Sequence, residues 1–496
     1  MPVSPPVSSG PFDAGPFDAA VIGSGPNGLA AAVALAQAGR RVVVYEGAPT
    51  LGGSARTLPL TLPGFRHDLC SSIHPMAAGS PFLASLPLRA HGLRWLHSAA
   101  VVAHPQDDGP AVLQLRFLLL TPEWLGADRR RYPQAIGPFA AAFADLSRDA
   151  LAPLGLPSRP FLLARFGLHA MLPATTLAHA LFRDARTRAF FGGHAAHSVL
   201  PLDRSPSAAI GLMLLLAGHA VGWPFPEGGA QAIVDALAAH LATLGGVVRL
   251  DTPIRRLEEV ETAGPVLFQT SPGALADIAG AALPEGYRRR LRAFRWGPGV
   301  FKLDWALSEP IPWRDPACAQ AATVHLGGDL AALTESERAP WQGRHAARPF
   351  VLLTQPSRFD PTRAPPGRGT AWAYCHVPAG STVDMTDAIE DEVERQAPGF
   401  RDCVLARHRL HTAALEAYNP NHVGGDVNGG AADLDQLFTR PVAALNPYAT
   451  PNPRLFICSA SSPPGGGVHG MAGWFAAQAA LGRPMRPPPR GAGAGA

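Results

Sequence analysis

The sequence has few charged residues and almost no lysine. Asp, Glu, Lys and Arg make up 16% of its 496 residues, against roughly 25% in average soluble proteins. Lys302 is the only lysine, and the formal net charge is +4. A positive balance this weak over this length does not indicate a polyanionic partner. We therefore expect no nucleic-acid-binding function.

Cysteine is also scarce. Five cysteines lie far apart without a C-x-x-C pair, so neither a disulfide framework nor a zinc ribbon is indicated: Cys70, Cys318, Cys375, Cys403 and Cys458. Histidines occur twice at i,i+3 spacing, but neither pair carries the carboxylate of an H-E-x-x-H motif. We expect no metal site and a reducing compartment.

No hydrophobic run is long enough to span a bilayer. The longest, residues 208–218, falls short of the ~18 residues that a spanning helix needs. The first residues have neither the positive n-region nor the apolar h-region of a secretory signal. These absences predict a cytoplasmic protein with a flexible leader at residues 1–16 and a flexible tail at residues 483–496.

What the sequence does contain is a glycine turn inside the unit that such a turn needs. Residues 19–22 are predicted to form a buried strand, residues 29–38 a helix and residues 42–45 a second strand. A G-x-G-x-x-G pattern between the first strand and the helix permits a tight turn and a close approach to pyrophosphate, which the helix N-terminus attracts. The unit therefore predicts a dinucleotide site, with candidate residues Gly23, Gly25, Pro26, Asn27 and Gly28.

An acidic residue and a second glycine pair specify the dinucleotide further. Glu46 ends the second strand, where a carboxylate bonds a ribose hydroxyl and would repel the 2′-phosphate of NADP. Gly52 and Gly53 follow, so that the backbone can pass near the diphosphate, and Ser54 and Arg56 come directly after them. This doublet resembles a pattern shared by amine oxidases and phytoene desaturases. It favours FAD over NAD.

A second glycine turn, Gly465-x-Gly467-x-x-Gly470, lies near the end of the chain. A predicted strand at residues 454–459 precedes it, and a predicted helix at residues 468–481 follows. The further strand and acidic residue of an independent Rossmann unit are missing. A helix N-terminus nevertheless suits the N1/C2=O edge of a reduced flavin, where negative charge develops.

Together the two turns resemble the phytoene desaturase-like FAD-dependent oxidoreductases, a group that includes relatives of retinol saturase and carotene isomerase. The similarity extends through residues 223–257, 297–307, 371–378, 419–430 and 446–480. The resemblance implies that both turns hold one FAD, shared by the two chain ends. It also implies cofactor contacts at Gly467, Val468 and His469 and an adenine contact at Ile254.

The predicted fold class is α/β. The resemblance implies a discontinuous Rossmann-like FAD-binding domain and a second, α+β substrate domain. We assign residues 17–75, 223–295 and 441–482 to the first domain, and residues 76–222 and 296–440 to the second.

Three histidines are candidate catalytic residues because of their positions. His469 lies in the turn that opens the last helix, His74 follows the region where the family folds over the flavin, and His376 lies in a predicted aromatic strand. For each of them a structural role is the alternative. No compact catalytic triad is visible, which is consistent with flavin chemistry in which the protein mainly aligns the substrate.

One segment suggests contact with lipid. Residues 160–172, continuing to Phe182, mix Phe and Leu with Arg and His. Such a mixture is typical of an interfacial patch on a bilayer, and an ordinary core helix is the alternative. Peripheral membrane association is therefore a hypothesis.

The leading functional hypothesis is an FAD-dependent oxidoreductase of the desaturase or dehydrogenase type. It would transfer hydride between flavin N5 and a hydrophobic alkene or isoprenoid-like substrate. Alternatives are an amine-oxidase-like flavoenzyme, a redox-neutral flavin-dependent isomerase or cyclase, and a binding protein that retains FAD without catalysis. The sequence leaves open the substrate, the reaction direction, the electron acceptor (oxygen, quinone or NAD(P)) and the oligomeric state.

Overall fold

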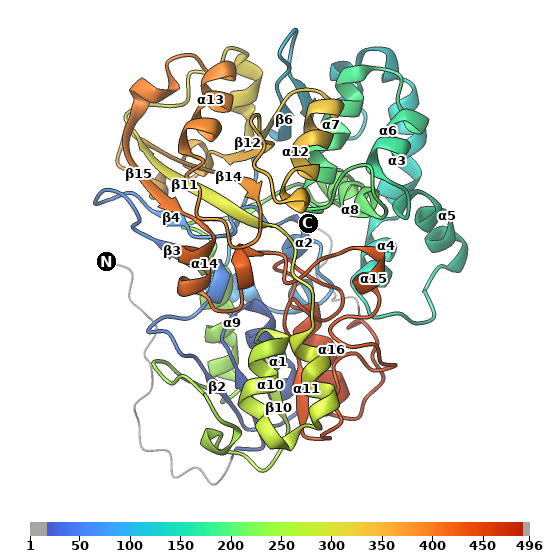
Figure 1. Cartoon of the computed structure of the whole chain (residues 1–496), viewed down its shortest axis with the longest axis vertical. Helices are drawn as coiled ribbons and strands as arrows, with labels where there is room; N and C mark the ends of the chain where they lie inside the picture. Colours follow the sequence, from blue (N-terminus) through green and yellow to red (C-terminus); the bar gives the residue numbers. More distant parts are fainter. Residues whose placement is uncertain (1–16, 490–496) are drawn as a thin grey trace.

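The computed structural model describes residues 17–489, which form two lobes, each built around a β-sheet (Figure 1). The predicted leader at residues 1–16 lies outside the described residues. So does part of the predicted tail, residues 490–496.

The lower lobe in Figure 1 holds a parallel sheet of five strands. In spatial order the strands are β16 (Leu455–Ile457), β10 (Val266–Phe268), β1 (Ala19–Ile22), β2 (Val42–Tyr45) and β9 (Val247–Arg249). These strands are short apolar runs because both faces of a parallel sheet are covered by helices. The strands come from the three segments that were assigned to the FAD-binding domain, although the domain boundaries themselves stay predictions.

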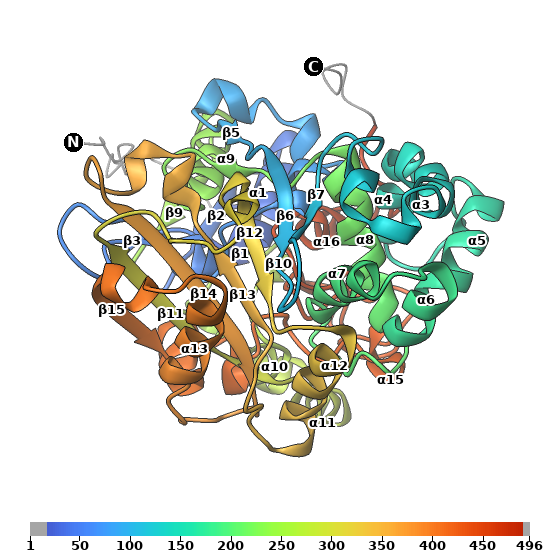
Figure 2. The ribbon, with the colours of Figure 1, turned by 90° about the horizontal axis from the view of Figure 1, so that it is seen from above.

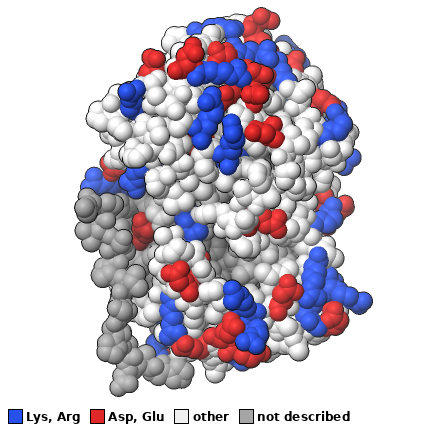
Figure 3. Space-filling model, turned by 60° about the vertical axis from the view of Figure 1, so that its left-hand side comes forward, with Lys and Arg blue, Asp and Glu red and all other residues white. Residues whose placement is uncertain are grey.

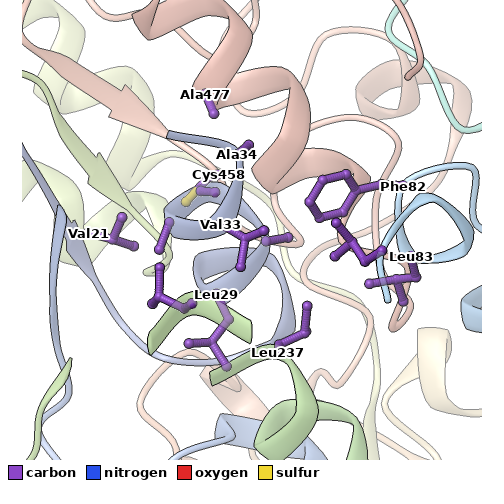
Figure 4. Packing of buried hydrophobic residues seen from close by; sticks show 14 of the residues in the cluster. Val21, Leu29, Val33, Ala34, Phe82, Leu83, Leu237, Cys458 and Ala477 are labelled. Atoms are coloured by element: carbon purple, nitrogen blue, oxygen red, sulfur yellow. The ribbon is translucent and has the colours of Figure 1, made fainter. Parts of the chain in front are cut away.

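Alternate residues of these strands point to two separate cores. Val21 and Val44 face α1 (Pro26–Gln37), α9 (Gln231–Thr243) and α16 (Met471–Ala480). The strand residues that alternate with these two lie on the opposite face of the sheet and pack against α10 (Pro272–Ala279) and α11 (Glu285–Arg292). Figure 4 shows the first core, in which Val33 of α1, Leu237 of α9 and Ala477 of α16 come together.

The upper lobe holds a sheet of seven strands, antiparallel except where β12 pairs with β6. In spatial order they are β15 (Val404–Leu410), β11 (Gly299–Leu307), β14 (Gly369–Val377), β13 (Val351–Thr354), β12 (Ala321–Leu326), β6 (Ala100–His104) and β7 (Val112–Gln114). Two short antiparallel pairs complete the strands: β3 (Thr57–Leu58) with β4 (His67–Asp68), and β5 (Trp95–Leu96) with β8 (Phe225–Pro226).

Helices cover the seven-stranded sheet unevenly. One face packs on α13 (Thr386–Gln396). The other face meets a helical group, which Figure 2 shows beside the sheet: α3 (Arg131–Ala141), α4 (Phe143–Ala150), α5 (Pro160–Ala170), α6 (Ala174–Leu181), α7 (Ala185–Ala196), α8 (Ser207–Ala220) and α12 (Leu330–Arg338). The remaining helices are α2 (Pro75–Ala78), α14 (Thr412–Tyr418) and α15 (Leu434–Leu437). The predicted α/β fold with a second α+β lobe is confirmed.

A buried ion-pair network joins the lobes. Arg363 of the upper lobe binds Asp68 at 2.6 Å and Asp360 at 3.0 Å. Asp68 also accepts hydrogen bonds from the N–H of Ala230 (2.9 Å) and the hydroxyl of Thr57 (2.7 Å). Burial alone would raise the pKa of Asp68, but Arg363 and the hydrogen bonds hold it below its ordinary value. The network fixes the segment after β4, which leads into the cavity described below.

Two helix predictions need correction at their first residue. The first helix begins at Pro26 and not at residue 29, because Pro26 occupies the first helical position. The last helix begins at Met471 and not at residue 468, because Gly470 is its N-cap and has a left-handed φ of +70°, which residues within a right-handed helix do not adopt. Part of the predicted tail, residues 483–489, is described and contacts the rest of the chain: Trp474 donates to the carbonyl of Arg486 (2.8 Å), and Arg148 to that of Pro488 (2.8 Å). The flexible tail itself stays a prediction.

The surface carries charges of both signs. On the face in Figure 3, acidic and basic side chains intermix and gather at two ends, with a largely uncharged band between them. Among residues 17–489, no single helix is long and apolar enough to cross a membrane, and the apolar pair α5 and α6 is bent by 105°.

Replacing Gly473 with alanine tests the contact of the first and last helices. A Cβ at this position would lie 1.9 Å from the carbonyl oxygen of Asn27 in α1, so the helices must separate. We expect Gly473→Ala to lower the free energy of unfolding by about 2–4 kcal/mol, measured by denaturant titration, and to reduce the FAD content of the purified protein.

Gly273→Ala is the matched control. Gly273 also lies in a helix, but nothing stands within 4 Å of its added Cβ. This change should stabilise the protein by up to about 1 kcal/mol, since alanine favours helix. Equal stability of the two variants would contradict the importance of the helix contact.

Candidate cofactor and substrate site

A single cavity of about 810 Å³ runs between the two lobes. One end lies at the carboxyl ends of the parallel strands, around β1, where ligands of open α/β sheets bind. The other end is lined by the seven-stranded sheet and by α8. Both glycine turns contribute to its wall, with Gly23 and Gly25 from the first and Gly467 from the second. The two turns therefore belong to one site.

The first turn is shaped by close backbone contacts. Gly23 has a φ of +101°, and α1 begins after Gly25 without a side-chain cap from that residue, so that the positive end of the helix faces the cavity. A Cβ on Gly28 would lie 2.1 Å from the carbonyl oxygen of Gly23. Pro26 and Asn27 line the cavity, whereas Gly28 does not.

Gln269, which sequence reasoning missed, braces this turn. Its Oε1 accepts the N–H of Gly28 at 3.0 Å. Its Nε2 lies so close to Gly25 that a Cβ there would be 2.2 Å away. Gln269 follows β10, and only the pairing of β10 with β1 brings it to the turn. No local motif could have indicated it.

Glu46 stands at the end of β2 with a fixed orientation. Its carboxylate accepts the N–H of Ser24 and that of Ala48, each at 3.0 Å, and the hydroxyl of Ser24 at 2.5 Å, and Arg56 lies 3.5 Å away. Because a carboxylate offers about four acceptor positions and these hydrogen bonds use three of them, it can still accept one bond from a ribose hydroxyl. Ile254, the predicted adenine contact, also lines this part of the cavity.

Arg56 and the second glycine pair have mainly structural roles in the cavity wall. Arg56 donates to the carbonyls of Leu51 (3.0 Å) and Thr50 (2.5 Å) and to the hydroxyl of Tyr418 (3.0 Å). It lines the cavity with Gly53 and Ser54, but Gly52 does not. Its guanidinium is therefore largely engaged by the protein, and a direct contact with the diphosphate stays a prediction.

His469 presents an unpartnered N–H beside the second turn. Its Nδ1 accepts the N–H of Met471 at 3.1 Å, so the ring proton is on Nε2. That nitrogen is buried and makes no hydrogen bond within the described chain. Burial lowers the pKa of His469 to about 4, partly opposed by nearby backbone carbonyls. At neutral pH it is an uncharged donor on the cavity wall, next to Val468.

The other two candidate histidines are placed differently. His74 lines the cavity, with Nδ1 3.2 Å from the Ser71 hydroxyl and a pKa that burial lowers to about 4. His376 is not among the cavity residues of the described chain. Its Nδ1 pairs with Glu337 of α12 at 2.7 Å. The structure therefore brings two of the three histidines to the site.

Residues 419–430 form part of the cavity wall, although the sequence predicted no site residue among them. His422 bonds the Ser54 hydroxyl through Nε2 at 2.7 Å, and Asn419 donates to the same hydroxyl at 3.2 Å. Arg440, buried and also on the cavity wall, donates to the carbonyl of Gly429 at 2.8 Å. The sequence offered a resemblance over this segment, but it did not show which residues would face the site.

The polar atoms left without partners fit FAD. Within residues 17–489, eight buried wall residues of the cavity have an unbonded nitrogen or oxygen: Asn27 (Oδ1), His74 (Nε2), His422 (Nδ1), Arg440 (Nε) and His469 (Nε2), and, on the seven-stranded sheet, Thr323 (Oγ1), Thr354 (Oγ1) and Trp372 (Nε1). Buried polar groups are normally paired, so a ligand with many acceptors and donors is expected here. Together with two helix N-termini and Glu46, those of these atoms that lie outside the seven-stranded sheet suit a cofactor with a diphosphate, a ribose and a polar ring edge.

Comparisons with known proteins agree with this site. A family model described as "NAD(P)-binding Rossmann-like domain" matches residues 21–84, which include the first turn and Glu46. Pyridine nucleotide-disulfide oxidoreductase domain-containing protein 2 of Mus musculus is 26% identical, over 92% of each chain. Phytoene dehydrogenase of Streptomyces griseus is 26% identical, over 78% of this chain and 77% of that protein.

A solved structure shares the whole fold. Putrescine oxidase bound to putrescine superposes with a TM-score of 0.61 at 17% identity, over 94% of this chain and 99% of the other. The predictions of an oxidoreductase and of FAD as its cofactor are confirmed at this level.

Glu46→Gln tests the assignment of the ribose site. The amide keeps the shape but loses the charge that strengthens hydrogen bonds to a ribose. We expect the dissociation constant of FAD to rise about 10-fold, which equals about 1.4 kcal/mol, measured by quenching of flavin fluorescence. Glu261→Gln is the control, because Glu261 pairs with Arg249 on the surface of the same lobe. Unchanged FAD affinity in Glu46→Gln would contradict the assignment.

Proposed function

We propose that this oxidoreductase acts on a hydrophobic alkene or isoprenoid-like substrate, in the manner of a desaturase or dehydrogenase. The observation that carries the proposal is the contrast between the two ends of one cavity. Beside the glycine turns the wall is polar. Beyond them it is built mainly from apolar and aromatic side chains: Ile210, Met213, Leu214, Trp223, Leu352, Trp372 and Tyr374.

The chemistry requires alignment and exclusion of water more than a strong base. In the desaturation direction, one carbon of the substrate loses a hydride and the adjacent carbon loses a proton to a nearby group or a water molecule, and a double bond forms between the two carbons. Bound FAD supplies the two-electron acceptor at N5. The apolar wall holds the substrate chain and keeps competing water away. Similarity to the phytoene dehydrogenase of Streptomyces griseus supports this substrate class.

The cavity is poorly suited to a cationic amine. Glu46 is the only acidic residue on its wall within the described residues, and it lies at the cofactor end. A diamine such as putrescine would bring a second ammonium group to the apolar end, where no carboxylate pairs with it. The fold shared with putrescine oxidase therefore does not indicate that this protein acts on a diamine.

Anaerobic mixing with an isoprenoid polyene tests the reaction class. With oxidised holoprotein and phytoene as the probe, we expect the visible absorption of the flavin to bleach, with one flavin reduced for each double bond formed. The absorbance is followed in time, and the product is identified by mass spectrometry.

The other reaction classes give different results. Conversion of phytoene by pre-reduced protein without net oxidation would indicate an isomerase or cyclase. Peroxide release with aliphatic amines would indicate an amine oxidase. If the protein retains flavin but neither phytoene nor an amine bleaches it, the result would contradict catalysis both as a desaturase and as an amine oxidase. Free FAD mixed with phytoene is the control.

We also propose that α5 contacts a lipid surface through which such a substrate arrives. Phe161 and Leu168 of α5 are 92% and 74% exposed, and Leu154 and Leu156 precede them with 76% and 103% exposure. Arg165 lies on the same helix. Exposed apolar side chains beside basic ones are suited to the interface of an anionic bilayer.

Cosedimentation with vesicles of phosphatidylglycerol and phosphatidylcholine tests this contact. We expect the double variant Phe161→Ser/Leu168→Ser to lose most of the bound fraction, because it removes apolar area from the interface. Leu405→Ser is the control, since Leu405 is an exposed leucine of β15, on the opposite side of the molecule in Figure 1. Wild-type protein that stays wholly in the supernatant would contradict the proposal.

A further inference from the structure

Three side chains form a continuous row on the apolar wall of the cavity. They are Thr323 of β12, Thr354 of β13 and Trp372 of β14. The strand register places Thr323 opposite Thr354, and Thr354 opposite Trp372. Side chains of directly opposed residues point to the same face of a sheet. All three line the cavity, and none is more than 4% exposed.

Each member of the row has a polar atom with no hydrogen-bond partner among residues 17–489. These atoms are Oγ1 of Thr323, Oγ1 of Thr354 and Nε1 of Trp372. A buried polar group without a partner costs free energy, and native structures rarely leave one unpaired. Here three lie side by side and border an open space. The natural partner is a group that enters the cavity.

The chemistry of the row specifies that group. An indole N–H can only donate a hydrogen bond, whereas a threonine hydroxyl can donate or accept. The ligand atom must therefore accept at least one hydrogen bond, as an oxygen does. The row carries no net charge, and the nearby cation Lys302, whose Nζ lies 5.0 Å over the Trp372 ring, is paired with Asp304. A neutral oxygen fits better than a carboxylate.

We propose that this row is a binding subsite for a hydroxyl or carbonyl oxygen of the substrate. The inference rests on the proposed function and makes it more specific: the substrate is a long apolar molecule that carries a neutral oxygen, not a pure hydrocarbon. The oxygen would anchor one part of the chain at the sheet. The apolar residues around the row would hold the rest.

The next row along the same strands does not offer such a subsite. It consists of His325, Leu352 and Tyr374. Leucine has no polar atom. His325 is not a cavity residue: its Nε2 pairs with Nε2 of His197 at 2.9 Å, and its unpartnered Nδ1 does not line the cavity. Among the sheet residues that line the cavity, the buried unpartnered polar atoms thus lie at one level, which is what selective binding of one oxygen requires.

Binding of farnesol and farnesene to the holoprotein tests the subsite. The two probes share an isoprenoid skeleton, and only farnesol carries a hydroxyl. Their dissociation constants are measured from the perturbation of the flavin spectrum, and the farnesol-to-farnesene ratio is compared between proteins, so that differences in hydrophobicity of the probes cancel. In Thr354→Val and in Trp372→Phe we expect this ratio to rise about 10-fold, equal to about 1.4 kcal/mol, with farnesene binding unchanged.

Thr370→Val is the matched control. Thr370 lies on β14 two residues before Trp372, is equally buried and also has an unbonded hydroxyl, but it is not a cavity residue. Its replacement should leave the ratio as in wild type. The same change in all three variants would overturn the proposal.

The outcomes separate this inference from the proposed function. If both probes bind and the ratio stays constant in Thr354→Val and Trp372→Phe, water fills the row; the subsite is then wrong, and the proposed substrate class stands. If neither probe binds to wild-type protein, the isoprenoid-like substrate class fails, and the subsite fails with it.

Discussion

The close contact between α1 and α16 is the constraint on which the site depends. Gly473 has no side chain, so the backbone of α16 lies directly against the carbonyl of Asn27 in α1. Each of these helices begins at a glycine turn, and both turns line the same cavity. Two positive helix ends thus face one ligand. Segments more than 400 residues apart in sequence form a single cofactor site because their helices pack without intervening side chains.

The two sheets serve the site in different ways. The parallel sheet presents the ends of its strands, where turns and helix N-termini supply backbone N–H groups and Glu46 supplies a carboxylate. The seven-stranded sheet presents a face, so its side chains enter the cavity as rows, such as Thr323, Thr354 and Trp372. The Asp68–Arg363 pair and the bonds between residues 419–430 and Ser54 hold the two lobes at a fixed distance.

The sequence predicted the local parts of the site well, because their signals are local. The strand–turn–helix unit around Gly25 and the acidic end of β2 follow from spacing alone. Gln269, His422 and Arg440 could not be predicted in the same way, since tertiary pairing alone brings them to the wall. His376 shows a further limit: it shares a sheet face with Trp372, but α12 covers that end of β14, and Glu337 binds its ring. Strand periodicity predicts on which face of a sheet a side chain lies, but it does not predict how far a cavity extends along that face.

The distribution of charge along the cavity explains why a neutral substrate fits. The ionised side chains on its wall, Glu46, Arg56 and Arg440, all belong to the cofactor end. Burial lowers the pKa of His74, His422 and His469 to about 4, so these rings are uncharged donors and acceptors at neutral pH. A charged substrate group at the apolar end would therefore lose its hydration without gaining a counter-ion, which is costly in a medium of low dielectric constant. A neutral chain pays no such penalty, and hydrogen bonds from uncharged side chains are sufficient to orient it.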